Sequence, residues 1–351
     1  MMRIGIVNDV SLAVETLRRI VVSVPGYEVA WIAEDGEAAV RRCAADVPDL
    51  ILMDLMMPRM DGAEATRIIM KQSPCAILVV TATVGGHAAK VFEAMGWGAL
   101  DAVDTPVLGL SGDPSSATHL LEKMAMLGRL IGRTGPKAKK FSAVAARQTS
   151  PGTLPLVAIG ASTGGPGALA QVIGELPNDL NATVALVQHV DEQFAPGLAS
   201  WLAGQTGHDV RIISPGDRLE AGRVLLASTN DHLVLTSEGV LQYTPEPADY
   251  PYRPSVDVFF QSIASFWPGP IVGVLLTGMG ADGAEGLLGL RRAGWHTIAQ
   301  DQSTSIVYGM PKAAAKLHAA VEVLPVDQIA DAIGHAVRGA ASRRPRQRSA
   351  L

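Results

Sequence analysis

The sequence lacks the long apolar run that a membrane-spanning helix requires, and Asn8 and Asp9 interrupt its opening residues too early for a signal peptide. A cytoplasmic location is therefore expected. Cysteine is scarce, and Cys43 and Cys75 both lie in apolar surroundings, where free thiols are expected rather than a disulfide or a metal site. The chain also lacks the Gly-Lys-Ser/Thr of a P-loop and the G-x-G-x-x-G of a dinucleotide site, which argues against a nucleotide-binding loop.

Charged side chains are few, 18% of the 351 residues, and they are unevenly distributed. Residues 1–128 carry 10 basic and 16 acidic side chains and residues 155–337 carry 8 and 18, whereas residues 129–154 carry 6 and none. The chain is long enough for two domains, and the basic, Gly- and Pro-containing segment 129–154 is expected to be a flexible linker between them. The basic residues 339–351 are expected to be a disordered tail. Contact with nucleic acid is the weaker alternative, because no base-reading motif accompanies these charges.

The first half alternates apolar strands with amphipathic helices. Five such units predict an open, parallel, doubly wound sheet, because right-handed crossovers place helices on both of its faces. Asp9, Asp54 and Thr81 each fall at the carboxyl end of a predicted strand, where ligands of such sheets bind. Two carboxylates brought together there repel each other unless a cation joins them, so Mg²⁺ is a natural third member. Alternatively, Asp9 is a helix N-cap and Asp54 a turn residue.

With Pro58 and Asp61-Gly62 following Asp54, this half resembles response-regulator receiver domains, which have a flavodoxin-like five-stranded parallel sheet. The resemblance implies that Asp54 accepts a phosphoryl group, that Asp9 and Asp54 hold Mg²⁺ during phosphorylation, and that the Thr81 hydroxyl senses the phosphoryl group.

Three positions depart from the receiver pattern. The usual acidic pair is Asn8-Asp9, the usual lysine before Pro106 is Thr105, and the usual aromatic switch residue is Ala102. Loss of the lysine removes a cation that would face the phosphoryl group.

The second half is organised around residues 157–166, an apolar strand that runs into a glycine-rich turn containing Ser162. Gly160, Ser162 and Gly164 satisfy G-x-S-x-G, in which a sharp strand-to-helix turn presents a serine hydroxyl for nucleophilic attack. The helix that follows adds free backbone N–H groups nearby. A serine N-cap and a phosphate-binding loop are the alternative interpretations of this motif alone.

Further strands and helices predict a second doubly wound α/β sheet, from 155 to 338, with an antiparallel β-hairpin inserted in its middle. His189 and Asp282 each follow a predicted strand, so both can converge on Ser162 at one sheet edge. His189 is preferred on position alone, because five further histidines follow it: His208, His232, His296, His318 and His335.

Five motifs in order resemble the catalytic domain of the chemotaxis methylesterase family, CheB: Gly160-Ala161-Ser162-Thr163-Gly164-Gly165-Pro166, Gln188-His189, Arg253-Pro254-Ser255-Val256-Asp257, Leu276-Thr277-Gly278-Met279-Gly280-Ala281-Asp282-Gly283 and Gly309-Met310-Pro311. The resemblance implies a protein-glutamate methylesterase with Ser162 as nucleophile, His189 as base and Asp282 as its orienting partner. The backbone N–H groups of Met279 and Thr163 are expected to hold the oxyanion. No cofactor is expected for the esterase step.

The same resemblance implies a substrate and a regulator. The substrate would be methylated glutamate on the cytoplasmic helices of a chemoreceptor, with deamidation of receptor glutamines in some members. A CheA-type histidine kinase would phosphorylate the receiver, which restrains the esterase until then. The receiver motifs look most like the branch that serves Wsp-type surface-sensing pathways.

Two alternatives stay open on the residues alone. The chain could be a serine esterase or amidase with another substrate, or a phosphorylation-dependent binding protein with a vestigial serine site. A DNA-binding regulator is disfavoured, because the second half is acidic and far larger than a helix-turn-helix module.

Overall fold

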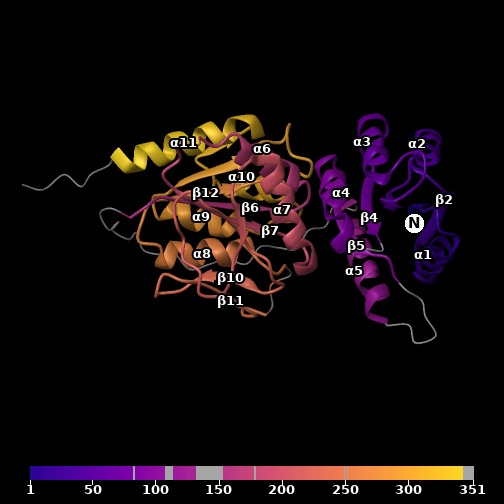
Figure 1. Cartoon of the computed structure of the whole chain (residues 1–351), viewed down its shortest axis with the longest axis horizontal. Helices are drawn as coiled ribbons and strands as arrows, with labels where there is room; N and C mark the ends of the chain where they lie inside the picture. Colours follow the sequence, from indigo (N-terminus) through magenta and orange to yellow (C-terminus); the bar gives the residue numbers. More distant parts are fainter. Residues whose placement is uncertain are drawn as a thin grey trace, which may run out of the picture. The chain divides into compact units, whose positions relative to one another are not determined.

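The structure, a computed structural model, describes residues 1–81, 84–106, 114–131, 153–177, 179–248, 250 and 252–342. The chain divides into two units, Met1–Gly135 and Pro136–Leu351, which are described separately (Figure 1). The boundary falls within the expected linker, most of which lies outside the described residues, as does the expected tail beyond residue 342. The helix before the linker ends at Ile131 and the last helix ends at Ser342, so both extend a few residues into the segments expected to be linker and tail.

The first unit contains the predicted five-stranded parallel sheet, with strand order β2-β1-β3-β4-β5. Its short third strand is wholly buried, as expected for a continuous apolar run covered on both faces. Aspartates cap two of its helices, since Asp35 accepts the N–H of Ala38 and Asp61 accepts the N–H of Glu64. The elements are β1 (Met2–Val7), α1 (Ser11–Ser23), β2 (Tyr27–Ala33), α2 (Gly36–Ala45), β3 (Leu50–Met53), α3 (Gly62–Gln72), β4 (Ala76–Thr81), α4 (Val84–Gly96), β5 (Asp101–Asp104) and α5 (Pro114–Ile131).

The prediction of free thiols is confirmed. Cys43 is buried and Cys75 half-buried, and their sulfur atoms lie 4.0 Å apart without a covalent bond.

The second unit contains a seven-stranded parallel sheet with strand order β14-β13-β12-β6-β7-β9-β8. In Figure 1, α6, α7 and α11 lie on one side of this sheet and α8 and α9 on the other, so the fold is doubly wound as predicted. Its elements are β6 (Leu156–Ala161), α6 (Gly165–Gly174), β7 (Thr183–Gln188), η1 (Glu192–Phe194), α7 (Ala195–Thr206), β8 (Val210–Ile212), β9 (Val224–Leu226), β10 (His232–Leu235), β11 (Leu241–Thr244), α8 (Val256–Phe266), β12 (Ile271–Leu275), α9 (Ala284–Arg292), β13 (His296–Gln300), α10 (Met310–Lys316), β14 (Glu322–Leu324) and α11 (Val326–Ser342).

The predicted hairpin forms, but it does not interrupt the sheet. Strands β10 and β11 pair antiparallel in a two-stranded sheet of their own, which packs on α8, whereas β9 joins the parallel sheet. The edge strands β8 and β14 are three residues each, too short to give a clear strand pattern in the sequence.

The order of the strands places a ligand-binding edge in each unit. In the second, β6 lies between β7 and β12, where the direction of the strand order reverses; in the first, β1 lies between β2 and β3 in the same way. Sites in open α/β sheets form beyond the carboxyl ends of strands at such a switch point. Within the described part of the chain, no helix is long and apolar enough to cross a membrane.

Candidate active site

Ser162 follows the wholly buried strand β6 directly and is itself 7% exposed. Its N–H donates to the carbonyl of Thr277 (3.0 Å), and its carbonyl accepts the N–H of Gly165 (2.7 Å) in the turn that begins α6. The left-handed conformation in this turn belongs to Gly164, the α6 N-cap, with φ 75°. Among the described residues, only Arg59 and His318 combine a side chain with positive φ, so Ser162 is presented without backbone strain.

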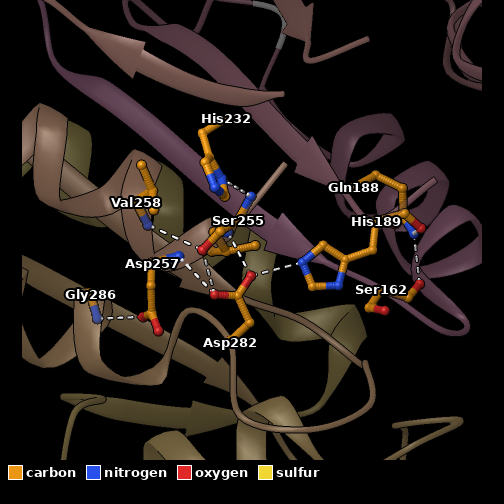
Figure 2. A network of polar contacts seen from close by, with 10 residues as sticks. Ser162, Gln188, His189, His232, Ser255, Asp257, Val258, Asp282 and Gly286 are labelled. Atoms are coloured by element: carbon orange, nitrogen blue, oxygen red, sulfur yellow. Dashed lines mark hydrogen bonds and ion pairs between the residues drawn. The ribbon is translucent and has the colours of Figure 1, made fainter. Parts of the chain in front are cut away.

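His189 follows β7, the neighbour of β6, so its imidazole reaches the same sheet edge as Ser162. Its Nε2 lies 2.8 Å from Oδ2 of Asp282. Its Nδ1 is buried and has no hydrogen-bond partner among the described residues. Figure 2 shows Ser162 on the Nδ1 side of the ring, with Asp282 on the opposite side. The ring therefore has one nitrogen fixed by a carboxylate and the other available to a proton from Ser162.

Asp282 lies in the loop after β12 and is held by the N-terminus of α8. It accepts hydrogen bonds from Ser255 Oγ (2.7 Å), Val256 N (2.7 Å) and Asp257 N (3.2 Å), as Figure 2 shows. Burial raises the pKa of this carboxyl, but the hydrogen bond and charge of His189 and the bonds from Ser255 and Val256 outweigh it, so the net pKa is lowered. Asp282 is therefore an anion placed at a helix N-terminus.

Two further residues lie near Asp282: Asp257, which the sequence presents in a motif, and His232, which is one of the further histidines; the sequence patterns assign a role to neither. Asp257, in the first turn of α8, accepts the N–H of Gly286 (2.6 Å); burial, and then the charge of Asp282, raises its pKa well above the usual range. His232, fully buried, accepts the N–H of Ser255 through Nδ1 (3.1 Å), so its Nε2–H donates to the carbonyl of Pro247 (3.2 Å). His189 is preferred because it follows a predicted strand, and the same criterion distinguishes it from His232, which has a structural role.

Tyr252 is a further neighbour that the sequence reasoning missed. Its ring stacks on that of His189, with centroids 4.6 Å apart and planes 10° from parallel. A Cβ on Gly280 would come within 3.3 Å of the Tyr252 hydroxyl, so this ring also contacts the loop that carries Met279. Its place immediately before the Arg253-Pro254-Ser255 motif was the only signal in the sequence.

The two expected oxyanion donors lie on the loops beside Ser162. Within the part of the chain that the structure describes, neither the N–H of Thr163 nor that of Met279 donates to a protein acceptor. Gly278, which precedes Met279, packs against Ser162 so closely that a Cβ there would lie 2.7 Å from that of Ser162. Both N–H groups are thus available next to the serine.

In the first unit, the sheet brings Asp54 and Asn8 into contact. The Asn8 amide donates to Oδ2 of Asp54 (3.0 Å), and the Leu55 N–H donates to Oδ1 (2.7 Å). Asp9 is exposed next to Asn8, and Thr81 is buried at the end of the neighbouring strand β4. No three His, Cys, Asp or Glu side chains of the described ranges are grouped as a complete metal site. Mg²⁺ commonly uses only one or two carboxylates together with phosphate oxygens and water, so the assignment of Asp9 and Asp54 as its ligands stays a prediction.

Comparison with known proteins assigns both units. Residues 157–333 match the family described as CheB methylesterase, and residues 4–108 match the response regulator receiver domain. A protein from Burkholderia orbicola (strain AU 1054), named protein-glutamate methylesterase/protein-glutamine glutaminase 2, is 56% identical over 330 residues, which cover 94% of this chain and 97% of that protein. The chain belongs to the CheB methylesterase family.

Other CheB proteins agree with this assignment. A Cupriavidus metallidurans protein of the same name is 57% identical over 329 residues, 94% of this chain and 96% of that protein. The crystal structure of the Thermotoga maritima CheB methylesterase catalytic domain is 31% identical with a TM-score of 0.50, and the match covers 52% of this chain and 98% of that one. These names do not distinguish a Wsp-type branch, which stays a prediction.

Proposed function

We propose that this chain is a phosphorylation-regulated protein-glutamate methylesterase that uses Ser162, His189 and Asp282 in nucleophilic catalysis. The observation that carries the proposal is the imidazole of His189. Asp282 holds its Nε2 at 2.8 Å, and its buried Nδ1, which has no hydrogen-bond partner among the described residues, lies on the side of Ser162. In this arrangement Nδ1 can accept the serine proton, and the Asp282 carboxylate at Nε2 can stabilise the positive charge that results.

The reaction follows from these positions. Ser162 Oγ attacks the carbonyl carbon of a γ-glutamyl methyl ester while His189 Nδ1 takes the hydroxyl proton. The N–H groups of Thr163 and Met279 bind the oxyanion of the tetrahedral intermediate. His189 then returns its proton to the departing methanol, which leaves an acyl-enzyme. Water, deprotonated by His189, attacks this ester; His189 then gives its proton to the departing Ser162 Oγ, and glutamate is released.

Asp282 supplies the charge that this cycle needs. His189 is positive in both tetrahedral intermediates, and the carboxylate beside Nε2 stabilises that form. Because the α8 N-terminus and Ser255 hold Asp282 in its ionised state, the carboxylate keeps its proton-free form when the imidazole becomes charged. The same steps would deamidate a glutamine, with ammonia in place of methanol as leaving group, and the names of the close relatives support this second reaction.

The substrate and the regulation are proposed from the family. The substrate is a methylated glutamate on the cytoplasmic helices of a chemoreceptor, and a cytoplasmic location fits it. Asp54 accepts a phosphoryl group from a CheA-type histidine kinase, and Thr81 senses it. Asp9 and Asp54 would hold the Mg²⁺ that neutralises charge during this transfer. Alternative targets for the serine site have no supporting observation in this chain.

The test is Ser162→Ala, assayed by methanol release from a methylated chemoreceptor fragment. Loss of the nucleophile in a serine triad costs on the order of 10⁶ in turnover, so activity should fall to background. Ser200→Ala is the matched control, because Ser200 is an exposed serine on α7 whose hydroxyl donates to the carbonyl of Pro196 (3.1 Å). Retention of more than about a tenth of the wild-type rate by Ser162→Ala would rule out Ser162 as nucleophile.

A further inference from the structure

Gln188, the last residue of β7, makes an unusual pair of contacts. The side chain is fully buried, and its amide Nε2 donates to two backbone carbonyls, that of Ser162 (2.8 Å) and that of His189 (3.1 Å). Two carbonyl acceptors identify this end of the amide as the nitrogen, because an oxygen there would face two other oxygens. Gln188 therefore bridges the loop of the candidate nucleophile and the loop of the candidate base.

The carbonyl of Ser162 and the N–H of Thr163 belong to one peptide unit. In a trans peptide the two groups point in opposite directions, so a bond that fixes the carbonyl also fixes the direction of the N–H. Figure 2 shows the Ser162 carbonyl turned to Gln188, with the Ser162 side chain on the Nδ1 side of the imidazole. The N–H of Gly165 binds the same carbonyl (2.7 Å) and adds a second restraint. The direction of the Thr163 N–H is thus set by the partners of Ser162.

The second expected oxyanion donor is fixed in the same way. The N–H of Met279 shares its peptide unit with the carbonyl of Gly278, which accepts hydrogen bonds from Met310 N (2.9 Å) and Gly309 N (3.1 Å) at the start of α10. Among the described residues, only backbone groups bind the carbonyl that orients the Met279 N–H, whereas the Thr163 peptide also depends on the Gln188 side chain. A side-chain substitution can therefore change the orientation of the Thr163 N–H without changing that of the Met279 N–H.

The surroundings of Gln188 are shaped to accept this amide. A Cβ on Gly165 would come within 2.0 Å of Gln188 Oε1, so only glycine permits the approach. The Oε1 atom itself is buried and has no hydrogen-bond partner among the described residues. An unpaired buried acceptor costs stability, so the contribution of this side chain lies in the two bonds that its nitrogen donates.

We infer that Gln188 is a positioning residue that aims the N–H of Thr163 at the oxyanion. The inference rests on the proposed function, because it assumes that Ser162 forms a tetrahedral intermediate. Removal of the amide leaves the Thr163 N–H in place but loosens its direction, since only the bond from the Gly165 N–H then restrains the Ser162 carbonyl. The loss should then be smaller than the 10²–10³-fold caused by deleting an oxyanion donor outright.

The experiment compares full-length wild type with Gln188→Met, which keeps the volume and removes both donated bonds. We expect kcat for methanol release, per titrated active site, to fall by about 10- to 100-fold with KM nearly unchanged, because only the transition state uses the oxyanion site. A boronic acid that adds to the serine as a tetrahedral anion should bind more weakly by a similar factor. Thr183→Val, a buried isosteric change at the other end of β7 that removes a hydroxyl without a described partner, should change neither value.

The outcomes separate three cases. If Ser162→Ala keeps its activity, the proposed function fails; if Ser162→Ala is inactive but Gln188→Met has the kcat of wild type, only the present inference fails. A lowered kcat with a shifted pH profile and unchanged boronic acid affinity would mean that Gln188 acts through His189, which also overturns it. Should Gln188→Met not fold, Gln188→Asn replaces it with the same expectation, since its amide falls one methylene short of Ser162.

Discussion

The imidazole of His189 contacts, or lies next to, three other residues of the site. Asp282 contacts one ring nitrogen, Ser162 lies beside the other, and Tyr252 covers a face at 4.6 Å between centroids. A cation over an aromatic face gains about 0.5–2 kcal/mol. In the proposed mechanism the imidazole is a cation only after it takes the serine proton, so this contact favours the intermediates over the ground state.

We expect Tyr252→Leu to lower kcat by roughly 2- to 30-fold, which is that energy expressed as a rate. Tyr252→Phe keeps the ring face and should retain most of the activity. The measurement is kcat against pH for both variants. Loss of activity in Tyr252→Phe as large as in Tyr252→Leu would assign the effect to the hydroxyl and contradict the stacking argument.

At the scale of elements, the N-terminus of α8 organises the polar half of the site. Ser255 caps the helix, accepting the N–H of Val258 (3.3 Å) while it donates to Asp282. Two carboxylates therefore lie at one helix end, one from the β12 loop and one, Asp257, from the helix itself. Helix N–H groups and His189 stabilise the charge of Asp282, whereas burial and the neighbouring Asp282 disfavour charge on Asp257.

This difference predicts a pH dependence of stability. Because the pKa of Asp257 is raised in the folded protein, the folded state binds more protons than the unfolded state above the unfolded pKa of about 3.9. Its stabilising contribution is complete below that pH and is lost as the pH rises through the folded pKa. Asp257→Asn should flatten this decline and raise the melting temperature more at pH 8 than at pH 4, as followed by thermal unfolding. An equal change in melting temperature at pH 8 and at pH 4 would contradict the raised pKa of Asp257.

Sequence patterns predicted best the strands in which every residue is buried. Strands β6 and β7 are wholly buried apolar runs, so their ends, and with them Ser162 and His189, could be placed from the sequence. The role of α8 could not, because its contact with Asp282 joins residues more than 20 positions apart through tertiary packing. The position of Tyr252 over His189 also depends on tertiary packing, and so does the pairing of β10 and β11 in a separate sheet. Neither could be predicted from the sequence pattern.

At the scale of the whole molecule, the chain carries two separate parallel sheets, each with its own core and its own switch-point edge. All three proposed catalytic residues belong to the second unit, and their described hydrogen bonds lie within it. We therefore expect residues 153–342 to fold alone and to release methanol. By the family arrangement the fragment should be faster than the unphosphorylated full chain. A slower fragment of equal thermal stability would show that the receiver supports the esterase rather than restraining it.

Regulation depends on the edge that holds Asp54. Thr105 lies there, since its N–H donates to the carbonyl of Thr81 (2.9 Å), and Asn8 contributes a neutral amide to Asp54 where an acid is usual. Phosphorylation adds nearly two negative charges at neutral pH. With threonine in place of the usual lysine, one charge-assisted contact, worth roughly 1.5–3 kcal/mol, is absent from the phosphorylated state.

Phosphorylation shifts the equilibrium between the restrained and the active state only as far as the phosphoryl group interacts differently with the two states. The activation ratio, which is the esterase rate with phosphorylation divided by the rate without it, should therefore be smaller in the wild type than in receivers with the lysine. Each 1.4 kcal/mol corresponds to about tenfold in an equilibrium constant, and we expect Thr105→Lys to raise the ratio by up to that factor. The ratio is methanol release with and without a small-molecule phosphodonor and Mg²⁺. Asp54→Asn combined with Thr105→Lys is the control, because a lysine that acts through the phosphoryl group has no effect once the acceptor is gone. An unchanged or reduced ratio in Thr105→Lys would instead mean that the loop at Thr105 meets the phosphoryl group through its backbone N–H groups.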